Sequence, residues 1–355
     1  MPYPKSNSFK HLIEEAAIHF KNKMPGVLFK NPGENSVQAV FQHDARIHEV
    51  TNFTERGFVF GPFLKDSLPI LIRPDREVSV ALQVAENKID PKEIVVKELS
   101  SEENRYKKLV EKAVEQIKLG ALKKVVLSRK LEVATTATPI EIFQRMLQRY
   151  PQAFCYYWVH PKVGTWVGAT PEILWSQRGK KFVTVALAGT LQKSQFPIPS
   201  WGAKEKEEQR LVTSYIKTAL SAHVEKMQIS EVETIDTGNL YHLKTTISGE
   251  FDPGNTKTIL QSLHPTPAVC GMPLEAARSF LSEHENYSRG YYTGYLGELN
   301  MGTDIYTRLF VNLRCMELQE QRAIIYVGGG ITEDSDSARE WEETVAKSKT
   351  MLQVV

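Results

Sequence analysis

Apolar positions recur with two different spacings along this 355-residue chain, and these spacings predict its helices and strands. Apolar residues three and four positions apart form one face of a helix, whereas short apolar runs bounded by Gly, Pro and Asn are typical of strands. The predicted helices cover residues 8–24, 102–119, 139–150, 204–228, 256–263 and 273–282, and a last one carries Glu340, Glu343 and Lys347. The predicted strands begin in a strand-like region at 26–90, with runs at 57–61 and 70–73, and continue at 124–133, 153–159, 164–168, 173–177, 182–187, 241–251, 292–300, 305–317 and 322–327.

Short turns join the strands of residues 153–187, and again those of residues 292–327, as in two antiparallel meanders. Together with the helices between them, these meanders predict an α+β fold in which sheets pack against helices. The length allows one large domain or two ordinary ones. The sequence contains no short repeat, low-complexity tract or long polar linker.

Composition and charge are those of an ordinary soluble protein, with a net charge of +2, 41% hydrophobic residues and 24% charged residues. Lys and Arg are spread along the chain, so neither nucleic acid nor an anionic membrane is expected as a partner. No apolar run is long enough to span a bilayer, and the first thirty residues lack the apolar core of a signal peptide. The three separated cysteines, Cys155, Cys270 and Cys315, predict reduced thiols in a cytoplasmic protein.

Two acidic helix segments are candidates for a metal site. Glu205 and Glu208 are three residues apart on the middle helix, and Glu340 and Glu343 are three apart on the last one, so each pair shares a helix face. Two such pairs are able to meet around one Mg²⁺, a hard ion that prefers carboxylates and water. The alternative is two solvated helix faces with local salt bridges, and Ser337 with Glu340 also fits a capping box.

The last predicted strand runs into three glycines, and this segment is a candidate anion site. Backbone N–H groups at Gly328, Gly329 and Gly330 are able to approach a substrate carboxylate closely. Arg314 on the neighbouring strand is placed to make a forked pair to the same group. The alternative is a Gly-rich turn with a structural arginine.

Glu172 and Lys124 are candidates for acid–base chemistry. Glu172 follows a proline at the start of an apolar strand, where burial would raise the pKa of its carboxyl and keep it protonated as a general acid. Lys124 leads another apolar strand, and if it points inward it is able to act as a base. The alternatives are a strand-edge glutamate that points to water and an edge lysine that protects the strand from aggregation.

The segment Leu263–Pro273 holds three prolines and a glycine, which predicts a rigid loop that walls a small pocket with Pro267, Ala268 and Gly271. His264 in this loop is more typical of a structural histidine than of a ligand. His242 remains open between a core residue and a hydrogen-bond donor to a substrate.

These segments, in this order, resemble the chorismate-utilising enzymes, and within that family the isochorismate synthases most closely. The resemblance covers residues 105–355, and the first hundred residues match the family's variable N-terminal part. A chance match of so many ordered motifs is remote. The motifs that carry it are Lys124–Arg129, Gly168–Glu172, Leu187–Thr190, the acidic start of the middle helix, Leu263–Ala268, Arg289–Gly294, Gly328–Ile331 and Glu340–Thr344.

The resemblance implies one large domain of two layered antiparallel sheets packed against helices. It implies Mg²⁺ held chiefly by Glu208 and Glu343, with Glu205 and Glu340 in support. It further implies that Lys124 is the base that activates water and that Glu172 is the acid that protonates the departing C4 hydroxyl. Water then adds at C2 of chorismate, the double bonds shift, and isochorismate results.

The resemblance also implies a set of substrate-binding residues. Those that match binders of the substrate carboxylates are Gly328, Arg314, Tyr292 and Lys347. Thr190 and His242 match residues that line the ring, and Ala268 belongs to the pocket wall. The chain departs from some relatives in having Lys244 after Tyr241 and His242, and in having Gly329 where others have Ala, without consequence for the chemistry.

Single residues distinguish among the different enzymes of this family. Lys124 argues against anthranilate synthase, which activates no water, and Ala188 argues against aminodeoxychorismate synthase, which has a lysine there. Salicylate synthase, which goes on to eliminate pyruvate, stays the second candidate, although its loop usually departs from the one at Leu263–Ala268. A non-catalytic paralogue would lack at least one of the catalytic or metal-binding residues. We therefore expect a monomer that acts on chorismate with no glutaminase subunit, and that feeds menaquinone or siderophore synthesis.

Overall fold

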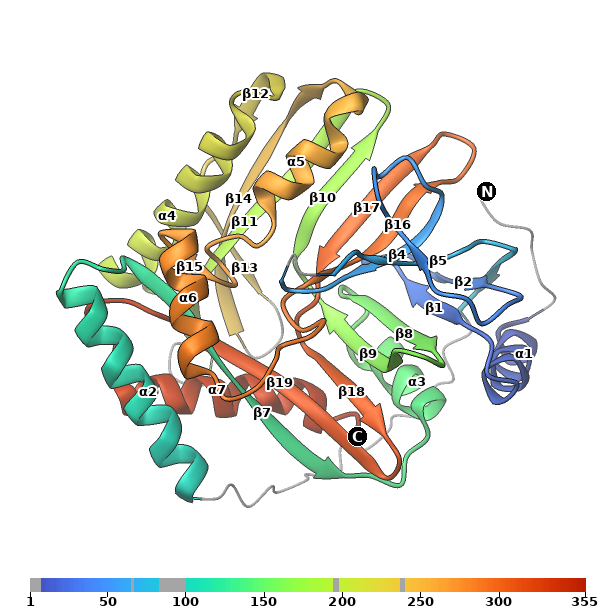
Figure 1. Ribbon diagram of the computed structural model, residues 1–355, viewed down its shortest axis with the longest axis horizontal. Coiled ribbons are helices and arrows are strands. Elements are labelled where there is room, and N and C mark those ends of the chain that lie inside the picture. Colours follow the sequence, from blue (N-terminus) through green and yellow to red (C-terminus); the bar gives the residue numbers. More distant parts are fainter. Residues whose placement is uncertain (1–7, 65–66, 83–99, 194–197, 237–239) are drawn as a thin grey trace.

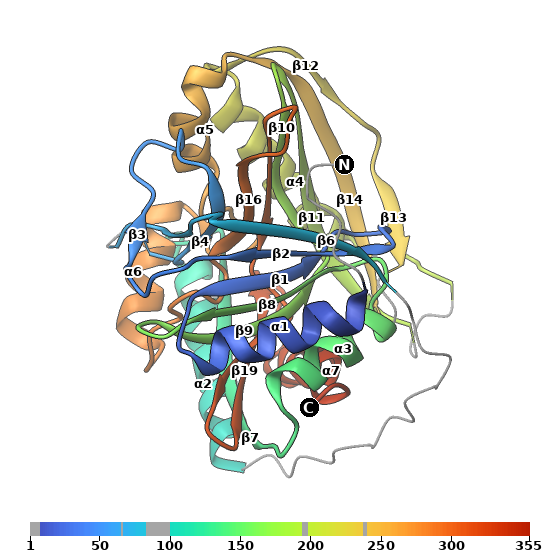
Figure 2. The ribbon, with the colours of Figure 1, turned by 90° about the vertical axis from the view of Figure 1, so that its right-hand side faces the viewer.

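Two large antiparallel sheets form the centre of the computed structural model, and helices cover their outer faces (Figures 1 and 2). The structure describes residues 8–64, 67–82, 100–193, 198–236 and 240–355. The part of the predicted strand-like region that follows residue 82 lies outside these ranges. The arrangement confirms the predicted α+β fold with two layered antiparallel sheets.

The first sheet has nine strands and is built from both ends of the chain. N-terminal strands pair with the hairpin of residues 154–170. Near the other end of the sheet, the strand of residues 124–134 pairs with the C-terminal strand of residues 322–331. In spatial order the strands are β15 (Gly271–Met272), β7 (Lys124–Ala134), β19 (Arg322–Ile331), β18 (Cys315–Gln319), β9 (Gly164–Thr170), β8 (Phe154–His160), β1 (Gly26–Lys30), β2 (Ser36–Phe41) and β6 (Arg76–Ala81).

The second sheet has ten strands, and nine of them follow one main path. One further strand, β13 (Glu233–Asp236), pairs with β14 off this path. In spatial order the strands are β12 (Val224–Ile229), β14 (Leu240–Phe251), β11 (Lys181–Gln192), β10 (Ile173–Arg178), β17 (Tyr306–Val311), β16 (Tyr295–Met301), β4 (Gly57–Gly61), β5 (Ile70–Ile72) and β3 (His48–Glu49).

Helices pack on the outer face of each sheet. Helices α1, α3 and α7 contact the first sheet, α4 and α5 lie on the second, and α2 packs against α7 and β7 (Figure 2). The α-helices are α1 (Phe9–Lys21), α2 (Ser100–Lys118), α3 (Pro139–Arg149), α4 (Ala203–Leu220), α5 (Thr256–Leu263), α6 (Leu274–His284) and α7 (Ser337–Leu352), and a short 3₁₀ helix covers Pro253–Asn255. No helix in the described residues is both long and apolar enough to cross a membrane.

Alternation along β8 shows why the sheets form a layered core. Successive side chains of a strand point to opposite faces, so Phe154, Tyr156 and Trp158 pack between the two sheets with Phe58 and Phe310. The intervening side chains, Cys155 and Tyr157, pack instead against α1 and α3. Both faces of the sheet are therefore apolar, and the strand is buried along almost its whole length.

The chain crosses from one sheet to the other at two places that matter for the site. One crossing lies between β9 and β10 at Pro171 and Glu172, and the other lies between β17 and β18 at residues 312–314. The two crossings are joined, because the N–H of Val311 donates to the carbonyl of Glu172 at 2.9 Å. Both segments therefore deliver their side chains to the same gap between the sheets.

Several predicted elements differ from the structure in their end residues, and three were wrong in a larger way. The helix predicted at 204–228 ends at Leu220, and β12 follows as an outer strand of the second sheet. The strand predicted at 305–317 is two strands in different sheets, because the chain turns through a left-handed Arg314 with φ +47°. The residues 292–294 that were predicted as strand form a turn before β16.

The three glycines Gly328–Gly330 also differ from one expectation, because they lie inside β19 and not in a turn. They pair with Ser128, Leu127 and Val126 of β7. On its other side, β19 pairs with β18 only at residues 322–325. Beyond residue 325, the edge of β19 that faces the crossing between the sheets is therefore not paired with β18. The pocket lies against this part of β19.

Candidate active site

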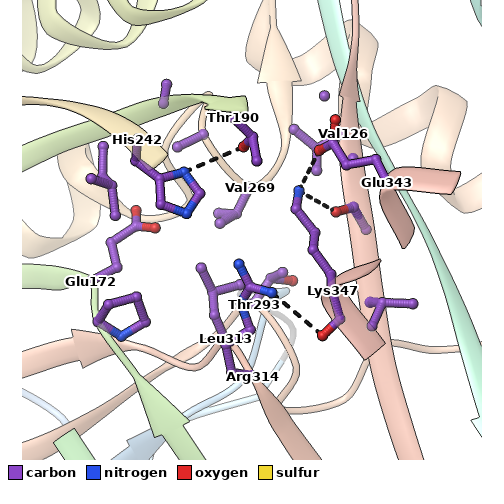
Figure 3. Close-up of a pocket in the computed structure, with 18 of the residues that line it drawn as sticks. Val126, Glu172, Thr190, His242, Val269, Thr293, Leu313, Arg314, Glu343 and Lys347 are labelled. Atoms are coloured by element: carbon purple, nitrogen blue, oxygen red, sulfur yellow. Dashed lines mark hydrogen bonds and ion pairs between the residues drawn. The ribbon is translucent and has the colours of Figure 1, made fainter. Parts of the chain in front are cut away.

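A pocket lies where the ends of β11, β14 and β19 meet the two crossings and the helices α4 and α7 (Figure 3). Ten of the thirteen site residues predicted from the sequence line it, although they come from segments far apart in the chain. These ten are Glu172, Thr190, Glu208, His242, Ala268, Tyr292, Arg314, Gly328, Glu343 and Lys347. Lys124 is not part of the lining, but it forms an ion pair with Glu208, which is. Glu205 and Glu340 lie outside the lining.

Glu172 is held at the first crossing by backbone contacts. Its N–H donates to Thr170 Oγ1 at 3.3 Å, and that hydroxyl donates to the carbonyl of Val311 at 2.6 Å. The side chain is only 5% exposed, so the alternative of a glutamate that points to water is wrong. Burial raises the pKa of the Glu172 carboxyl to about 8, although the charges of Lys124, Lys347 and Arg314 act in the opposite direction. The carboxyl therefore carries its proton at neutral pH.

Lys124 is the first residue of β7, and its side chain is fully buried. The alternative of an exposed edge lysine is wrong, because β15 covers that side of β7. Its ammonium pairs with Glu208 of α4 at 2.8 Å. Gly330 makes room for this pair, since a Cβ at Gly330 would lie 2.5 Å from Glu208 Oε1 and 3.0 Å from Lys124 Cε.

Two further ion pairs hold the acidic residues of the last helix. Lys204 of α4 pairs with Glu340 at 2.6 Å, and Ser335 Oγ donates to the same carboxylate at 2.7 Å. Lys347 pairs with Glu343 one turn away at 2.6 Å. Together with Lys124–Glu208, these pairs give three carboxylates from two distant helices, each facing one lysine.

The electrostatics of the acidic side chains differ with their surroundings. Burial by itself would raise the pKa of Glu208, but the charge and hydrogen bond of Lys124 outweigh it, and the pKa is lowered. Burial and the charge of Glu343 raise the pKa of Glu340, with Lys204 acting against them. Because Glu340 is 2% exposed, the alternative of a solvated helix face is wrong for this residue.

Glu205 and the start of α7 have local roles as well. Glu205 accepts a hydrogen bond from the N–H of Gly202 at 3.0 Å, which caps the start of α4. The capping box suggested for Ser337 and Glu340 does not form; Asp336 caps α7 by accepting from the N–H of Arg339 at 2.9 Å.

The carboxylates suit a hard divalent cation in chemistry, although they are not arranged as a finished metal site. Glu208 and Glu343 line one pocket, and Glu340 Oε2 is buried with no hydrogen-bond partner in the described structure. In the same ranges, no three His, Cys, Asp or Glu side chains are grouped so that they would already hold a metal ion. The donor set therefore fits Mg²⁺, provided that the lysine pairs open.

Two cationic side chains, Arg314 and Lys347, line the pocket, and Lys347 lies beside Glu343 (Figure 3). Lys347 Nζ donates to the carbonyl of Gly328 at 2.8 Å, and Arg314 Nη1 donates to the carbonyl of Lys347 at 3.4 Å. Burial lowers the pKa of the Arg314 guanidinium and raises that of the Tyr292 hydroxyl, so Tyr292 keeps its proton and remains a donor. Two cations and a phenol in one pocket form a site that accepts an anion.

His242 lies in the pocket and not in the apolar core. Its Nδ1 lies 3.0 Å from the carbonyl of Gly189 and 3.3 Å from Thr190 Oγ1. A carbonyl only accepts hydrogen bonds, so Nδ1 carries the ring proton and Nε2 presents a lone pair. Burial, with the charges of Arg314 and Lys347, lowers the pKa of His242 to about 3. In this arrangement His242 offers the pocket an acceptor at Nε2, which differs from both interpretations left open by the sequence, a core residue and a donor.

The rigid loop after α5 contributes one wall. Ala268 and Val269 line the pocket. His264, at the start of the loop, has its Nε2 3.1 Å from the carbonyl of Pro62, which agrees with the structural role expected of it.

Sequence reasoning missed several residues at or beside the site. Thr293 and Leu313 line the pocket from turns, where no periodicity marks them. Lys204 had a signal, because it lies four residues before Glu208 and shares its helix face. Tyr106 on α2 lies beside the acidic residues of α7, and its position in an ordinary amphipathic helix gave no sign of this.

Comparison with known proteins gives matches along most of the chain. The family model of the chorismate binding enzymes matches residues 70–355. The chain is 32% identical to isochorismate synthase DhbC of Bacillus subtilis (strain 168) over 271 residues, which cover 70% of this chain and 67% of that protein. It is 26% identical to isochorismate synthase EntC of Escherichia coli (strain K12) over 343 residues, which cover 91% and 86% of the two chains.

Solved structures share the fold. DhbC from Bacillus anthracis is similar with a TM-score of 0.80 at 24% identity, over 97% of this chain and 98% of that chain. MenF, the menaquinone-specific isochorismate synthase from Escherichia coli, gives a TM-score of 0.76 at 19% identity, over 93% and 88%. Anthranilate synthase component I from Streptococcus pneumoniae gives 0.68 at 17% identity, over 92% of each chain.

Proposed function

Because the chain belongs to the chorismate binding enzymes, we propose that it is an isochorismate synthase that converts chorismate to isochorismate with the help of Mg²⁺. The two sequence relatives reported above, DhbC and EntC, align over two thirds or more of both chains, and both carry that name. The observation that carries the proposal is the state of Glu172. Its carboxyl is buried and protonated at neutral pH, and it lines the same pocket as Arg314 and Lys347.

Substrate binding follows from charge and hydrogen-bonding capacity. Chorismate carries two carboxylates, and Arg314 and Lys347 are the cations that face the pocket. Tyr292 adds a donor beside Gly328, since a Cβ at Gly328 would lie 3.1 Å from its hydroxyl. His242 Nε2 and Thr190 are then left to face the ring and its hydroxyl group.

Glu172 and Lys124 divide the proton transfers between them. Lys124 takes a proton from water, the resulting hydroxide forms a bond to C2, and the double bonds shift. The C4–O bond breaks, and Glu172 gives its proton to the departing oxygen, so one water enters and one leaves. In the ion pair with Glu208 the lysine is an ammonium, so Lys124 has to separate from Glu208 and give up one proton before its amine is able to take a proton from water. A neutral amine and a neutral carboxyl near pH 7 are the pair that this reaction needs.

Glu208 and Glu343 are the residues that would hold Mg²⁺, with Glu340 and Glu205 in support. When bound, the ion supplies positive charge that orients a ring carboxylate and offsets its charge. The support for this part is the donor chemistry of the site and the unpartnered Glu340 Oε2.

Salicylate synthase remains the second candidate, because elimination of pyruvate from isochorismate would use the same binding residues. We expect a monomer that needs no glutaminase subunit. We propose that the product feeds menaquinone or siderophore synthesis, because relatives of both kinds are similar to this chain.

Product analysis tests the proposal. The purified protein is incubated with chorismate and Mg²⁺, and the products are separated by chromatography, with Glu172→Gln as the inactive control and Glu342→Gln, on the exposed face of α7, as the active one. Isochorismate as the sole product supports the proposal, whereas salicylate with pyruvate supports the second candidate. No turnover by the wild type in the presence of Mg²⁺ refutes both.

A further inference from the structure

Two buried polar atoms beside Gly329 lack partners in the described structure. One is the hydroxyl of Tyr106, a residue of α2 that is 3% exposed, and the other is Glu340 Oε2. A Cβ at Gly329 would lie 3.7 Å from the Tyr106 hydroxyl, 3.3 Å from Glu340 Oε2 and 3.7 Å from Glu343 Oε1. The Tyr106 hydroxyl and two carboxylates therefore face one small space. This space stays free because glycine has no side chain to fill it.

The rest of Tyr106 behaves as an ordinary core residue. Its ring packs 6.0 Å from that of Trp341 and belongs to the apolar cluster of α2, α6, β7 and α7. A phenylalanine would fill the same space without a buried hydroxyl. An unsatisfied buried hydroxyl destabilises the folded state, and packing alone gives no reason for tyrosine here in place of phenylalanine.

We propose that Tyr106 is a positioning residue for the cation, and that its hydroxyl oxygen accepts a hydrogen bond from a water molecule in the hydration shell of Mg²⁺ held by Glu208 and Glu343, with Glu340 in support. This inference rests on the proposed Mg²⁺ site and assigns a role to a residue outside the acidic helices. Mg²⁺ usually keeps several of its waters in a protein site, and these waters, polarised by the ion, need hydrogen-bond acceptors around them. The carboxylates accept from these waters, and Tyr106 fixes the water that faces α2.

Binding and unfolding measurements on Tyr106→Phe test the role without relying on turnover. Titration calorimetry gives the dissociation constant for Mg²⁺, and thermal unfolding with and without Mg²⁺ gives the stabilisation by the ion. We expect the dissociation constant to rise about tenfold, the lower end of the effect of removing an indirect ligand contact. We also expect the metal-free melting temperature to stay the same or rise, because an unsatisfied hydroxyl is removed.

Tyr215→Phe is the matched control. The hydroxyl of Tyr215 donates to the carbonyl of Ser262 at 2.7 Å, away from the acidic residues, so its loss should lower the melting temperature and leave Mg²⁺ affinity unchanged. At saturating Mg²⁺, Tyr106→Phe should keep the wild-type KM for chorismate.

The outcomes separate this inference from the proposed function. Equal Mg²⁺ affinity in Tyr106→Phe and the wild type overturns the inference, as does a wild type that binds no Mg²⁺ in calorimetry. A lowered metal-free melting temperature with an unchanged gain from Mg²⁺ also overturns it, because the role is then structural. A wild type that binds Mg²⁺ in a Tyr106-dependent way and leaves chorismate intact supports the inference and refutes the proposed function.

Discussion

The raised pKa of Glu172 gives the enzyme an alkaline limit, and this limit is measurable. A general acid works only while it is protonated, and the pKa of this carboxyl is about 8 because it is buried. The protonated fraction is then about nine-tenths at pH 7 and about one-tenth at pH 9. We expect kcat/KM for chorismate to fall about tenfold per pH unit above pH 8. Glu172→Gln should lower kcat by about 10²–10⁴-fold and remove this limb.

The same pKa has a consequence for stability. The folded protein binds the Glu172 proton more tightly than the unfolded chain does, since the pKa rises from 4.5 to about 8. The stabilising contribution of this group is therefore complete below pH 4.5 and is lost as the pH rises through 8. The slope inside this window is about 1.4 kcal/mol per pH unit at most. The glutamine in Glu172→Gln has no proton to lose. The free energy of unfolding of this variant, relative to that of the wild type, should therefore increase as the pH rises.

The assay combines pH–rate profiles at saturating Mg²⁺ with urea unfolding at several pH values between 5 and 8. Glu342→Gln, an exposed residue of α7, is the control and should reproduce both wild-type curves. If the alkaline limb persists in the residual activity of Glu172→Gln, another group causes it. If the unfolding free energies of the wild type and Glu172→Gln run parallel across this range, Glu172 is not held protonated by burial, and its assignment as the acid loses its physical basis.

Three substitutions test the remaining parts of the site. Lys124→Ala should lower turnover by about 10²–10⁴-fold, because the base is gone, while calorimetry should show Mg²⁺ affinity that is no weaker than in the wild type. Glu343→Gln should raise the Mg²⁺ concentration for half-maximal activity by at least about tenfold, since a hard ligand loses its charge. Gly330→Ala should weaken Mg²⁺ binding and keep the fold by circular dichroism, because its Cβ would lie 2.5 Å from Glu208 Oε1, the mobile end of a side chain.

Each of these outcomes has a counterpart that contradicts it. Wild-type turnover by Lys124→Ala would remove that residue as the base. An unchanged Mg²⁺ titration for Glu343→Gln, alongside the exposed control Glu342→Gln, would place the metal elsewhere. Gly330→Ala is compared with Gly254→Ala, where the nearest atom to a new Cβ is 3.4 Å away; equal Mg²⁺ affinity in both would show that Glu208 needs no such room.

Local sequence patterns predicted most helices and strands, because their signals are local. Helix α5 begins and ends at the predicted residues, and α3 has the Thr138 and Glu141 capping box that its sequence allows. The boundary of α4 was wrong because residues 224–229 gain their strand partners from β14, which follows later in the chain. Propensity within the segment carries no information about such a partner.

The division of residues 305–317 between two sheets was invisible for a related reason. Both halves are apolar, and each pairs with strands that precede it by more than a hundred residues, β10 in one sheet and β9 in the other. The turn between them depends on Arg314 in a left-handed conformation. Arginine seldom adopts this conformation, so the sequence gives no sign of the turn. This hidden turn brings Arg314 to the pocket, so the most informative part of the site geometry required the structure.

Ion pairing in the site shows the same limit and adds a physical consequence. The pair of Glu343 with Lys347 is readable from their spacing of four residues, but Lys124–Glu208 and Lys204–Glu340 join elements that only the fold brings together. Three carboxylates and three lysines leave this part of the site without net charge. The proposed Mg²⁺ and a substrate with two carboxylates would bring equal and opposite charges to it. Each would therefore lower the electrostatic cost of binding the other. Either one alone would leave a net charge in the buried pocket.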